Sequence, residues 1–573
     1  MKIFKKTLNA LRRINISACV TALAVTLISL IASGVHAAPY NPPKVLASVT
    51  IPSESSAWNA LERLADEMKF SEVVKGAREL LNANSPYLAA LDSNSPIGFV
   101  VATDGDAVFF FGYFPLANTE SLDEEAINSL EAEIQTVSKI DDIELLVKDS
   151  KLFVTLSEFK DVIPTNLESY ENSNSASNDV SILNIDVDVD AIPEEFVEAG
   201  FAALRQKISE QASDETSLSA ANLNLLLKQY SSIIDSLKNI KIDLLVDAES
   251  NFVIKTSIAW KPESEIAKQL KASHETKTRW SSLISSGNAI FAAVSSGKTS
   301  DLFKEYQLDQ FNNVAYPNIL EQLEVLIDDP EDYEFAKQLA ELLKSEEIAS
   351  IEAGMFDSGI ALGTDPLLLK VGTSVSAPEA VKEALKLTAE RVRKDFADLD
   401  KYLVIDAEEI NGFSISKLNL PIAVICDEPA NYFTGKALTV SIGIDDKSFA
   451  LVAGLEPNQV DLEFAKLLLD AQELKATPKQ QFFDLAPLAK ITLEVLSSID
   501  ELEPVTRQSL EKVAGAQNVK LITEEDFIDN TLTVNFTLQS GIFKTAGELI
   551  RLGLRGPLSE DNSSDLDDVF DEE

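Results

Sequence analysis

The sequence predicts an α+β protein made of two similar repeats, each with an antiparallel sheet of hairpins packed against amphipathic helices. Three observations predict this fold. Short runs typical of strands are bounded by turn residues, helical segments begin at capping residues, and the same order of elements occurs twice along the chain. We therefore predict a first repeat at residues 45–272, a polar linker at 273–279 and a second repeat at 280–552.

The duplication is predicted from ordered local similarities. Each repeat opens with a short strand, at residues 45–51 and 289–294, which precedes helices and a hairpin. The segments "DSKLFVTLS", beginning at Asp149, and "DDKSFALVA", beginning at Asp445, carry Asp, Lys and Phe at equal offsets. One such match would be weak evidence of duplication, but it lies inside a longer ordered series.

The later elements follow the same order in both repeats. Asp188 corresponds to Asp484, and each repeat then closes with a helix, a hairpin and a further helix. Residues 402–436 have no counterpart in the first repeat and are predicted to be an insertion.

Capping residues mark several helix starts. Asp329-Pro330 offers a side-chain acceptor followed by a proline whose missing N–H costs nothing in the first turn. Ser121 with Glu124 and Ser376 with Glu379 form the spacing of a capping box. These positions predict helices in corresponding places of the two repeats.

The stretch "VVATDGDAVFFFGYFPL" at residues 100–116 has two interpretations. Asp104-Gly105 suits the type I′ turn of a hairpin, whereas Asp104 with Asp106 could bind a cation. The second repeat reads "MFDSGIAL", with Asp357 at the place of Asp104 and Ile360 at the place of Asp106. Because the second repeat lacks the paired carboxylates, we favour the turn.

The strand after this turn is apolar on both faces. Strand alternation places Phe109, Phe111 and Tyr113 on one face, and the opposite face is also apolar. Such a strand is either covered on both sides or forms one wall of an apolar pocket. We favour burial, and a hydrophobic ligand wall made by these three rings is the alternative.

The N-terminus predicts export. Residues 1–37 contain five basic side chains, an apolar run at 16–31 and the ending Val35-His36-Ala37, which is typical of a cleaved signal peptide. We expect cleavage after Ala37, a periplasmic or extracellular location and no membrane span in the mature chain; an uncleaved anchor is the alternative. At the other end, residues 558–573 are predicted to be a disordered acidic tail.

Composition excludes several function classes. The net charge of -44 disfavours nucleic acid as a partner and favours solubility. After removal of the leader, Cys426 and His274 are the only cysteine and histidine, so neither an intrachain disulfide nor a His/Cys zinc site can form. His274 has no nucleophile motif beside it, and no cofactor motif is found.

The segment "NIDVDVDA" contains Asp186, Asp188 and Asp190 at alternate positions. It lacks the Gly and the bidentate Glu that an EF-hand loop requires, and its alternation predicts a strand with an acidic solvent face. A weak surface site for a divalent cation at these three carboxylates is the alternative interpretation.

The layout resembles a family of uncharacterised, exported and internally duplicated proteins of planctomycete-type bacteria. The resemblance is carried by "LDSNSPIGFVV", "GYFPLANTESL" and the two segments that begin at Asp149 and Asp445. It covers most of the mature chain and implies export and duplication, but no activity, cofactor or site.

The sequence therefore predicts an exported, non-enzymatic binding or structural protein whose partner is an unknown protein or a hydrophobic ligand. One alternative is a carrier of a lipid or another hydrophobic molecule. A second alternative is a hydrolase that uses carboxylates, since the many acidic residues always provide some pair at a suitable spacing.

Overall fold

The structure of the chain is a computed structural model. It describes residues 44–84, 90–103, 108–117, 127–128, 131, 142–161, 179–211, 231–284, 289–395, 397–425, 433–498 and 503–554. The chain divides into two compact units, one with Met1–Ala60 and Gly76–Leu245 and the other with Leu61–Lys75 and Val246–Glu573.

The first unit is built around antiparallel strands. Its order of pairing is β4–β5–β3–β2–β1–β6. Asn239 of β7 donates a hydrogen bond to Asp186 of β6. The elements from the N-terminus to β7 are β1 (Lys44–Ile51), α3 (Glu54–Met68), α4 (Ser71–Asn84), β2 (Ile97–Thr103), β3 (Val108–Pro115), β4 (Ile143–Lys148), β5 (Lys151–Leu156), η2 (Ser157–Phe159), β6 (Val180–Asp188), η3 (Val189–Ala191), α8 (Glu194–Gln211) and β7 (Leu237–Val246).

The second unit contains a longer antiparallel series, with the order β8–β20–β19–β18–β10–β11–β12–β16–β15–β14–β13. Its first elements are β8 (Phe252–Trp260), α10 (Glu265–His274), β9 (Lys277–Thr278), η4 (Ser281–Leu283), β10 (Ala289–Lys298), α11 (Asp301–Gln310), the π-helical turn η5 (Phe311–Ala315), α12 (Tyr316–Leu326), α13 (Pro330–Ala353), β11 (Met355–Thr364) and β12 (Leu367–Ser374).

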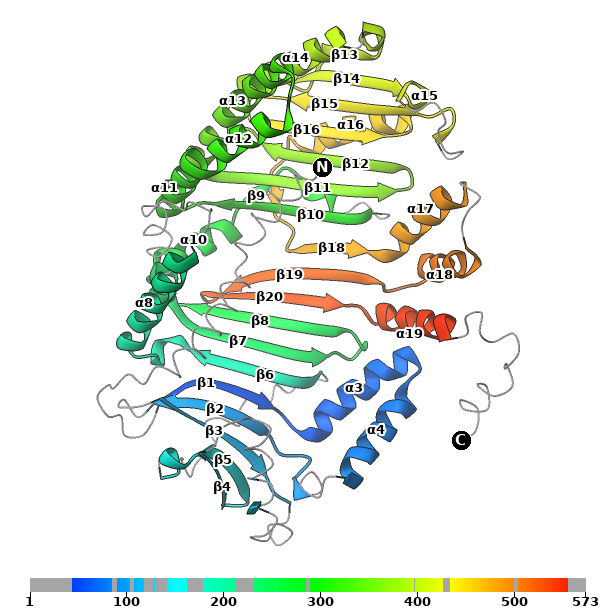
Figure 1. The fold of residues 1–573 in the computed structure, drawn as a ribbon. Coiled ribbons are helices and arrows are strands. Elements are labelled where there is room, and N and C mark those ends of the chain that lie inside the picture. Colours follow the sequence, from blue (N-terminus) through cyan, green and yellow to red (C-terminus); the bar gives the residue numbers. More distant parts are fainter. Residues whose placement is uncertain are drawn as a thin grey trace. The chain divides into compact units, whose positions relative to one another are not determined.

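The remaining elements of this unit are again a mixture of helices and strands. They are α14 (Pro378–Asp395), η6 (Ala397–Tyr402), β13 (Leu403–Ile410), β14 (Phe413–Pro421), α15 (Ile422–Ile425), β15 (Ala437–Ile444), β16 (Ser448–Gly454), α16 (Pro457–Asp470), β17 (Lys475–Ala476), β18 (Gln480–Asp484), α17 (Leu485–Ser497), α18 (Pro504–Ala514), β19 (Lys520–Ile528), β20 (Thr531–Leu538) and α19 (Ser540–Leu554). Figure 1 shows α11 to α14 along one end of these strands and α17 to α19 at the other end.

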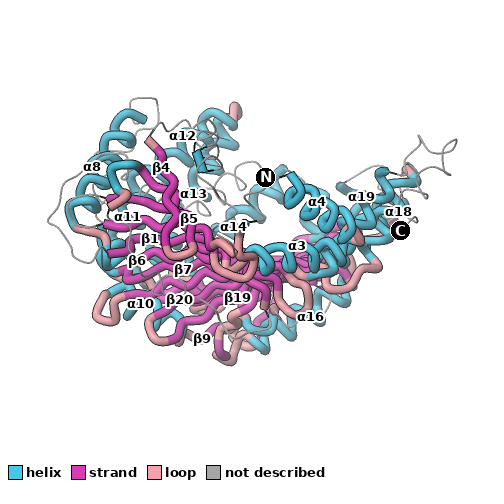
Figure 2. The backbone as a smooth tube through the Cα atoms, turned by 90° about the horizontal axis from the view of Figure 1, so that it is seen from below, coloured by secondary structure: helices cyan, strands magenta, loops and turns pink. Residues whose placement is uncertain are grey.

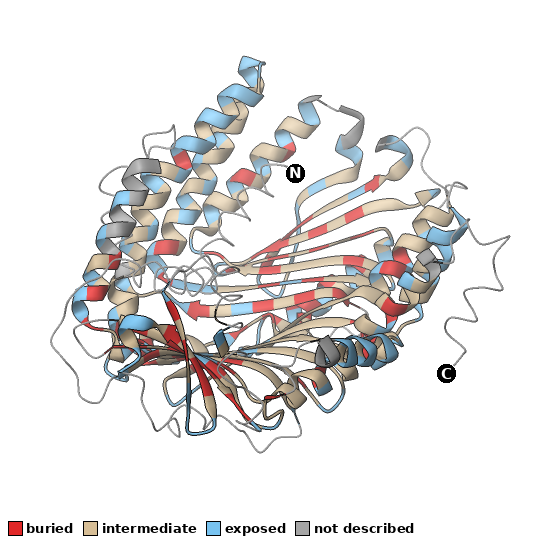
Figure 3. Ribbon diagram, turned by 60° about the horizontal axis from the view of Figure 1, so that its bottom comes forward, coloured by how far each residue is buried: buried red, intermediate tan, exposed pale blue. Residues whose placement is uncertain are grey.

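The strands of the second unit form one layer with helices on both sides. Figure 2 shows α16 and β9 on one side of that layer and α12 and α13 on the other. Buried and partly exposed residues alternate along the strands, as Figure 3 shows, and β16 repeats this pattern over its whole length. We call the side of the layer that carries α16 and β9 the α16 face.

The main core of the second unit lies on the α16 face. Trp280, which directly precedes η4, is fully buried there with Phe464 and Leu468 of α16 and Ile415 of β14. The sheet makes room for the indole at two glycines, Gly359 and Gly372, which pair directly with each other across β11 and β12. Small residues on the strands thus permit a large ring to pack closely against the sheet.

The predicted α+β class is confirmed, and so are the strands that open each predicted repeat, as β1 and β10. Asp329 caps α13 as expected, since its carboxylate accepts hydrogen bonds from the Glu331 and Asp332 amides. The start of α14 differs from the predicted capping box. There the carboxylate of Glu346, on α13, accepts from the amides of Ser376 and Ala377.

One predicted correspondence is wrong. Asp357 is the third residue of β11 and is not in a turn; the turn between β11 and β12 contains Asp365-Pro366. Residues 273–279, predicted to be a linker, contain the end of α10 and the two-residue strand β9. The predicted signal peptide and acidic tail, Asp104-Gly105, Ser121 with Glu124, and Cys426 lie outside the described residues.

Candidate functional site

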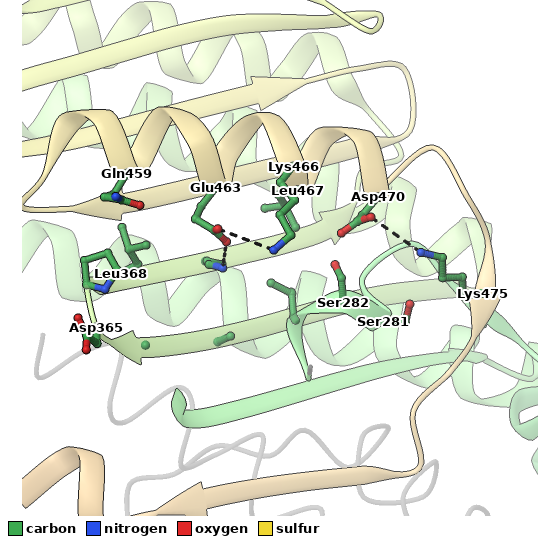
Figure 4. A pocket seen from close by; sticks show the side chains of 15 residues that line it. Ser281, Ser282, Asp365, Leu368, Gln459, Glu463, Lys466, Leu467, Asp470 and Lys475 are labelled. Atoms are coloured by element: carbon green, nitrogen blue, oxygen red, sulfur yellow. Dashed lines mark hydrogen bonds and ion pairs between the residues drawn. The ribbon is translucent and has the colours of Figure 1, made fainter. Parts of the chain in front are cut away.

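The second unit contains a pocket of about 730 Å³ on the α16 face. Its size is within the range typical of small-molecule sites. Figure 4 shows it as a trough between α16 and η4, with Asp365 near one end and Lys475 at the other. The lining residues are Ser281, Ser282, Leu283, Ala361, Gly363, Asp365, Pro366, Leu368, Lys370, Gln459, Glu463, Lys466, Leu467, Asp470 and Lys475.

The floor of the pocket consists of two residue pairs of the β11–β12 ladder. Ala361 pairs with Lys370, and Gly363 pairs with Leu368. Directly opposed residues of an antiparallel ladder point to the same face, so these four positions share one surface. Because two of them are Ala and Gly, the floor is low and leaves volume above it.

One wall is a stripe of α16. Gln459, Glu463, Lys466 and Asp470 follow at intervals of four, three and four residues, which places them on one face of a helix. The adjacent face of α16 carries Val460, Phe464, Leu467 and Leu468, which are buried against the sheet. Burial of the apolar face therefore fixes the direction in which the polar stripe points.

The charges of the pocket are balanced and partly paired. Lys370 forms an ion pair with Glu463, and the Nζ of Lys466 lies 3.8 Å from the same carboxylate. Burial alone would raise the pKa of Glu463, but the hydrogen bond and charge of Lys370 prevail and lower it. The Nζ of Lys475 lies 3.8 Å from the Asp470 carboxylate. Figure 4 shows these contacts along the trough.

The opposite wall, η4, is held in place from below by Asp357. Its Oδ1 accepts a hydrogen bond from the Thr278 hydroxyl at 2.5 Å, and its Oδ2 accepts from the Arg279 amide at 3.0 Å. The Thr278 hydroxyl oxygen in turn accepts from the Trp280 amide at 2.9 Å. One carboxylate on β11 therefore fixes the three residues that lead into η4.

Asp357 should make the stability of this wall depend on pH. Burial raises the pKa of Asp357 above its ordinary value of 3.8, although the Thr278 and Arg279 hydrogen bonds oppose the shift. The folded protein then binds a proton more readily than the unfolded chain, so the contribution of Asp357 to stability falls as the pH rises from 3.8 through the raised pKa.

We expect the difference in unfolding free energy between the wild type and Asp357→Asn to grow in favour of the wild type as the pH falls from 7 to 4. Urea denaturation at several pH values measures this difference, which cancels the titration of all other groups. Asp301→Asn, at a fully exposed side chain outside the pocket, is the control for the loss of one carboxylate. If the wild type loses its advantage over Asp357→Asn towards low pH, the pKa of Asp357 is lowered and not raised by folding.

Phe109, Phe111 and Tyr113, predicted to be either core or a ligand wall, lie in the first unit and are fully buried. They form one cluster with Val100 and Phe153. The ring of Tyr113 lies over Gly98, its ladder partner on β2. Protein side chains thus occupy the space beside these three rings.

The three aspartates predicted as a weak cation site lie at the end of β6 and in η3. Asp186 accepts a hydrogen bond from the side-chain amide of Asn239 at 2.5 Å and forms an ion pair with Lys241 at 2.8 Å. Asp188 and Asp190 are exposed. Within the described ranges, no three His, Cys, Asp or Glu side chains come together in a way that could hold a metal ion.

Sequence reasoning missed the pocket residues. The only local signal was the polar stripe of α16, which resembles any solvated helix face when the strand floor is unknown. No family model matches the chain, and neither a curated protein nor a solved structure is detectably similar to it. Among the described helices, none is long and apolar enough to cross a membrane.

Proposed function

We propose that this is an exported, non-enzymatic binding protein of two related halves, the predicted repeats 45–272 and 280–552, and that the pocket of the second half holds a small polar molecule. The observation that carries the proposal is the trough on the α16 face, where amines, carboxylates, hydroxyls and an amide converge above a low floor. Such convergent polar groups in a concave site are typical of ligand binding.

The duplication is supported by a shared irregularity. β1 has a bulge in its ladder with β2, and β10 has a bulge in its ladder with β11. The extra residue is Leu46 in the first and Ile290 in the second, and both are buried. The strand partners before each bulge are Ala102 and Gly363. Bulges are specific features of a fold, so their agreement favours a common origin.

The next ladder agrees with this correspondence. The residue that follows the extra residue pairs with Val187 of β6 in the first half and with Phe483 of β18 in the second. One position further along, Asp188 corresponds to Asp484, as the sequence predicts. Two independent ladders thus lead to the same correspondence.

The correspondence of the two Asp-Lys-Phe segments needs a shift by one residue. Phe153 pairs with Tyr113, and its ladder counterpart is Ala450, which pairs with Gly372. The sequence match aligns Phe153 with Phe449 instead. Phe153 and Ala450 are both buried whereas Phe449 is only partly so, which favours the ladder correspondence.

The halves then differ on equivalent surfaces. Val100 corresponds to Ala361, and their ladder partners are Phe111 and Lys370. By strand alternation, Phe109 and Tyr113 of the first half correspond to Leu368 and Gly372 of the second. Where the first half fills the space with aromatic rings, the second has smaller or polar residues, a buried Trp280 and the pocket. We therefore expect one binding site per chain.

The two other functions have less support. A hydrophobic carrier would need space beside Phe109, Phe111 and Tyr113, but other side chains surround these rings. A raised carboxyl pKa would support a hydrolase, but the pKa of Glu463, one carboxyl of the pocket, is lowered by Lys370.

The proposal is tested with four probes of similar size and different charge, namely trialanine, sucrose, citrate and spermidine. Binding to the full chain is followed by ligand-observed NMR. Gln459→Trp should block the trough from the helix wall, whereas Asn458→Trp, at the neighbouring exposed position that does not line the pocket, serves as the matched control. We expect at least one probe to bind the wild type and the control but not Gln459→Trp. If no probe binds, or if Gln459→Trp has no effect, the pocket is not the binding site.

A further inference from the structure

Resting on the proposed function, we infer that the pocket selects a linear zwitterion, such as a short peptide with free amino and carboxyl ends. The cationic end lies at Asp365 and the anionic end at Lys466 and Lys475.

The length of the trough suits an extended chain of three or four residues. The polar stripe of α16 runs from Gln459 to Asp470, which at a helical rise of 1.5 Å per residue corresponds to roughly 16 Å. An extended peptide spans about 3.3–3.6 Å per residue, so four residues cover roughly 14 Å. A single amino acid would reach only one end.

The charge of the lining favours a ligand without net charge. Lys370, Lys466 and Lys475 face the pocket together with Asp365, Glu463 and Asp470, so the formal charges cancel. A strongly anionic or cationic ligand would meet as much repulsion as attraction there. A molecule with both signs can place each of its charges against the opposite one.

The charged side chains in the middle of the trough are already paired with each other. Lys370 and Glu463 form a half-buried ion pair with each other, so their charges are already matched. Beside them, Ser281, Ser282 and Gln459 supply hydroxyl and amide groups, which can hydrogen-bond the peptide groups of a ligand. Recognition of charge is therefore left to the two ends.

The ends differ in charge: one carries the carboxylate of Asp365, and the other carries the ammonium groups of Lys466 and Lys475 beside the carboxylate of Asp470. Asp365 is exposed on the β11–β12 turn and closes one end of the trough in Figure 4. Towards the other end, the Nζ of Lys466 lies 3.8 Å from the Glu463 carboxylate, and the Nζ of Lys475 lies 3.8 Å from Asp470 and 3.9 Å from Glu473. These distances are beyond hydrogen-bond length, and the two lysine side chains are 65% and 45% exposed. Ammonium groups held in this way retain donors for a ligand carboxylate.

The test uses trialanine, N-acetyl-trialanine and trialanine amide, which differ in one end charge each. Calorimetric titration of the wild type should give about tenfold weaker binding for each blocked peptide, corresponding to about 1.4 kcal/mol per lost charge contact. In Asp365→Asn, N-acetyl-trialanine should bind as tightly as trialanine, whereas trialanine amide should still bind about tenfold more weakly. In Lys466→Gln, trialanine amide should bind as tightly as trialanine, whereas N-acetyl-trialanine should still bind about tenfold more weakly.

Matched controls separate local recognition from net charge. Asp301→Asn and Lys268→Gln change the same charges at exposed helix positions outside the pocket and should leave all three affinities unchanged. If all three peptides bind equally, or if another probe binds the trough while trialanine does not, the ligand class is wrong and the proposed function stands. If neither the peptides nor the other probes respond to Gln459→Trp, both proposals fail.

Discussion

Replacing Trp280 by Ala is expected to lower the free energy of unfolding by about 3–5 kcal/mol, as for other fully buried large rings. Trp280 is 0% exposed, and its indole is the largest fully buried side chain of the described residues. Its removal leaves a cavity over Gly359 and Gly372, and the strands cannot close it because they are held by ladders on both sides. Urea denaturation followed by circular dichroism measures the loss.

The glycine beneath the ring offers a reciprocal test. A Cβ added to Gly372 would overlap the indole of Trp280, so Gly372→Ala alone should also destabilise the fold. Combined with Trp280→Leu, the added methyl group should cost less than it does in the wild type, because the smaller side chain leaves room. Trp58→Ala, at a partly exposed ring in the other unit, is the control. Strictly additive losses in the double variant would contradict the contact between this glycine and the ring.

Phe111→Ala is expected to have an effect of similar size, about 3–5 kcal/mol, in the first unit. Phe111 is fully buried, and its ring centroid lies 6.2 Å from that of Phe153. Phe99, on the neighbouring strand, is 51% exposed, so Phe99→Ala should cost much less and serves as the control. Thermal and urea unfolding of both variants compare the two positions.

This variant also decides between the two interpretations of the aromatic face. If the three rings are core, Phe111→Ala lowers stability and leaves the uptake of hydrophobic probes such as a fatty acid unchanged. A variant that keeps its stability but loses the binding of a fatty acid would instead identify Phe111 as part of a ligand wall.

The sequence predicts the local elements well because local physics decides them. The N-cap at Asp329, the acidic strand with Asp186 and the aromatic strand with Phe111 each follow from neighbours a few residues away. The α16 stripe is equally visible in the sequence as a helix face. What the sequence lacks is the identity of the surface opposite this face, which comes from strands about 90 residues earlier, at Ala361 and Lys370.

The register of the strands also could not be predicted from the sequence. The segments beginning at Asp149 and Asp445 match in composition, yet the ladders favour a correspondence shifted by one residue. In a strand, such a shift moves every side chain to the other face of the sheet. A larger offset, of eight residues from 357 to 365, assigns the turn to Asp357 instead of Asp365 and hides the pocket end at Asp365. Ladder partners, which are distant in sequence, are needed to correct both.

The ladder between β8 and β20 has a consequence for the history of the fold. If the halves are related, β8 and β20 are equivalent closing strands, and they pair with each other in antiparallel fashion from Phe252 with Leu538 to Ala259 with Thr531. Such an edge is self-complementary, since a twofold axis exchanges the two strands. A single ancestral half would therefore have met a second copy of itself through this strand, and gene fusion would have turned a homodimer into one chain. On that relation, the aromatic filling of one half and the pocket of the other would have arisen by divergence at equivalent positions.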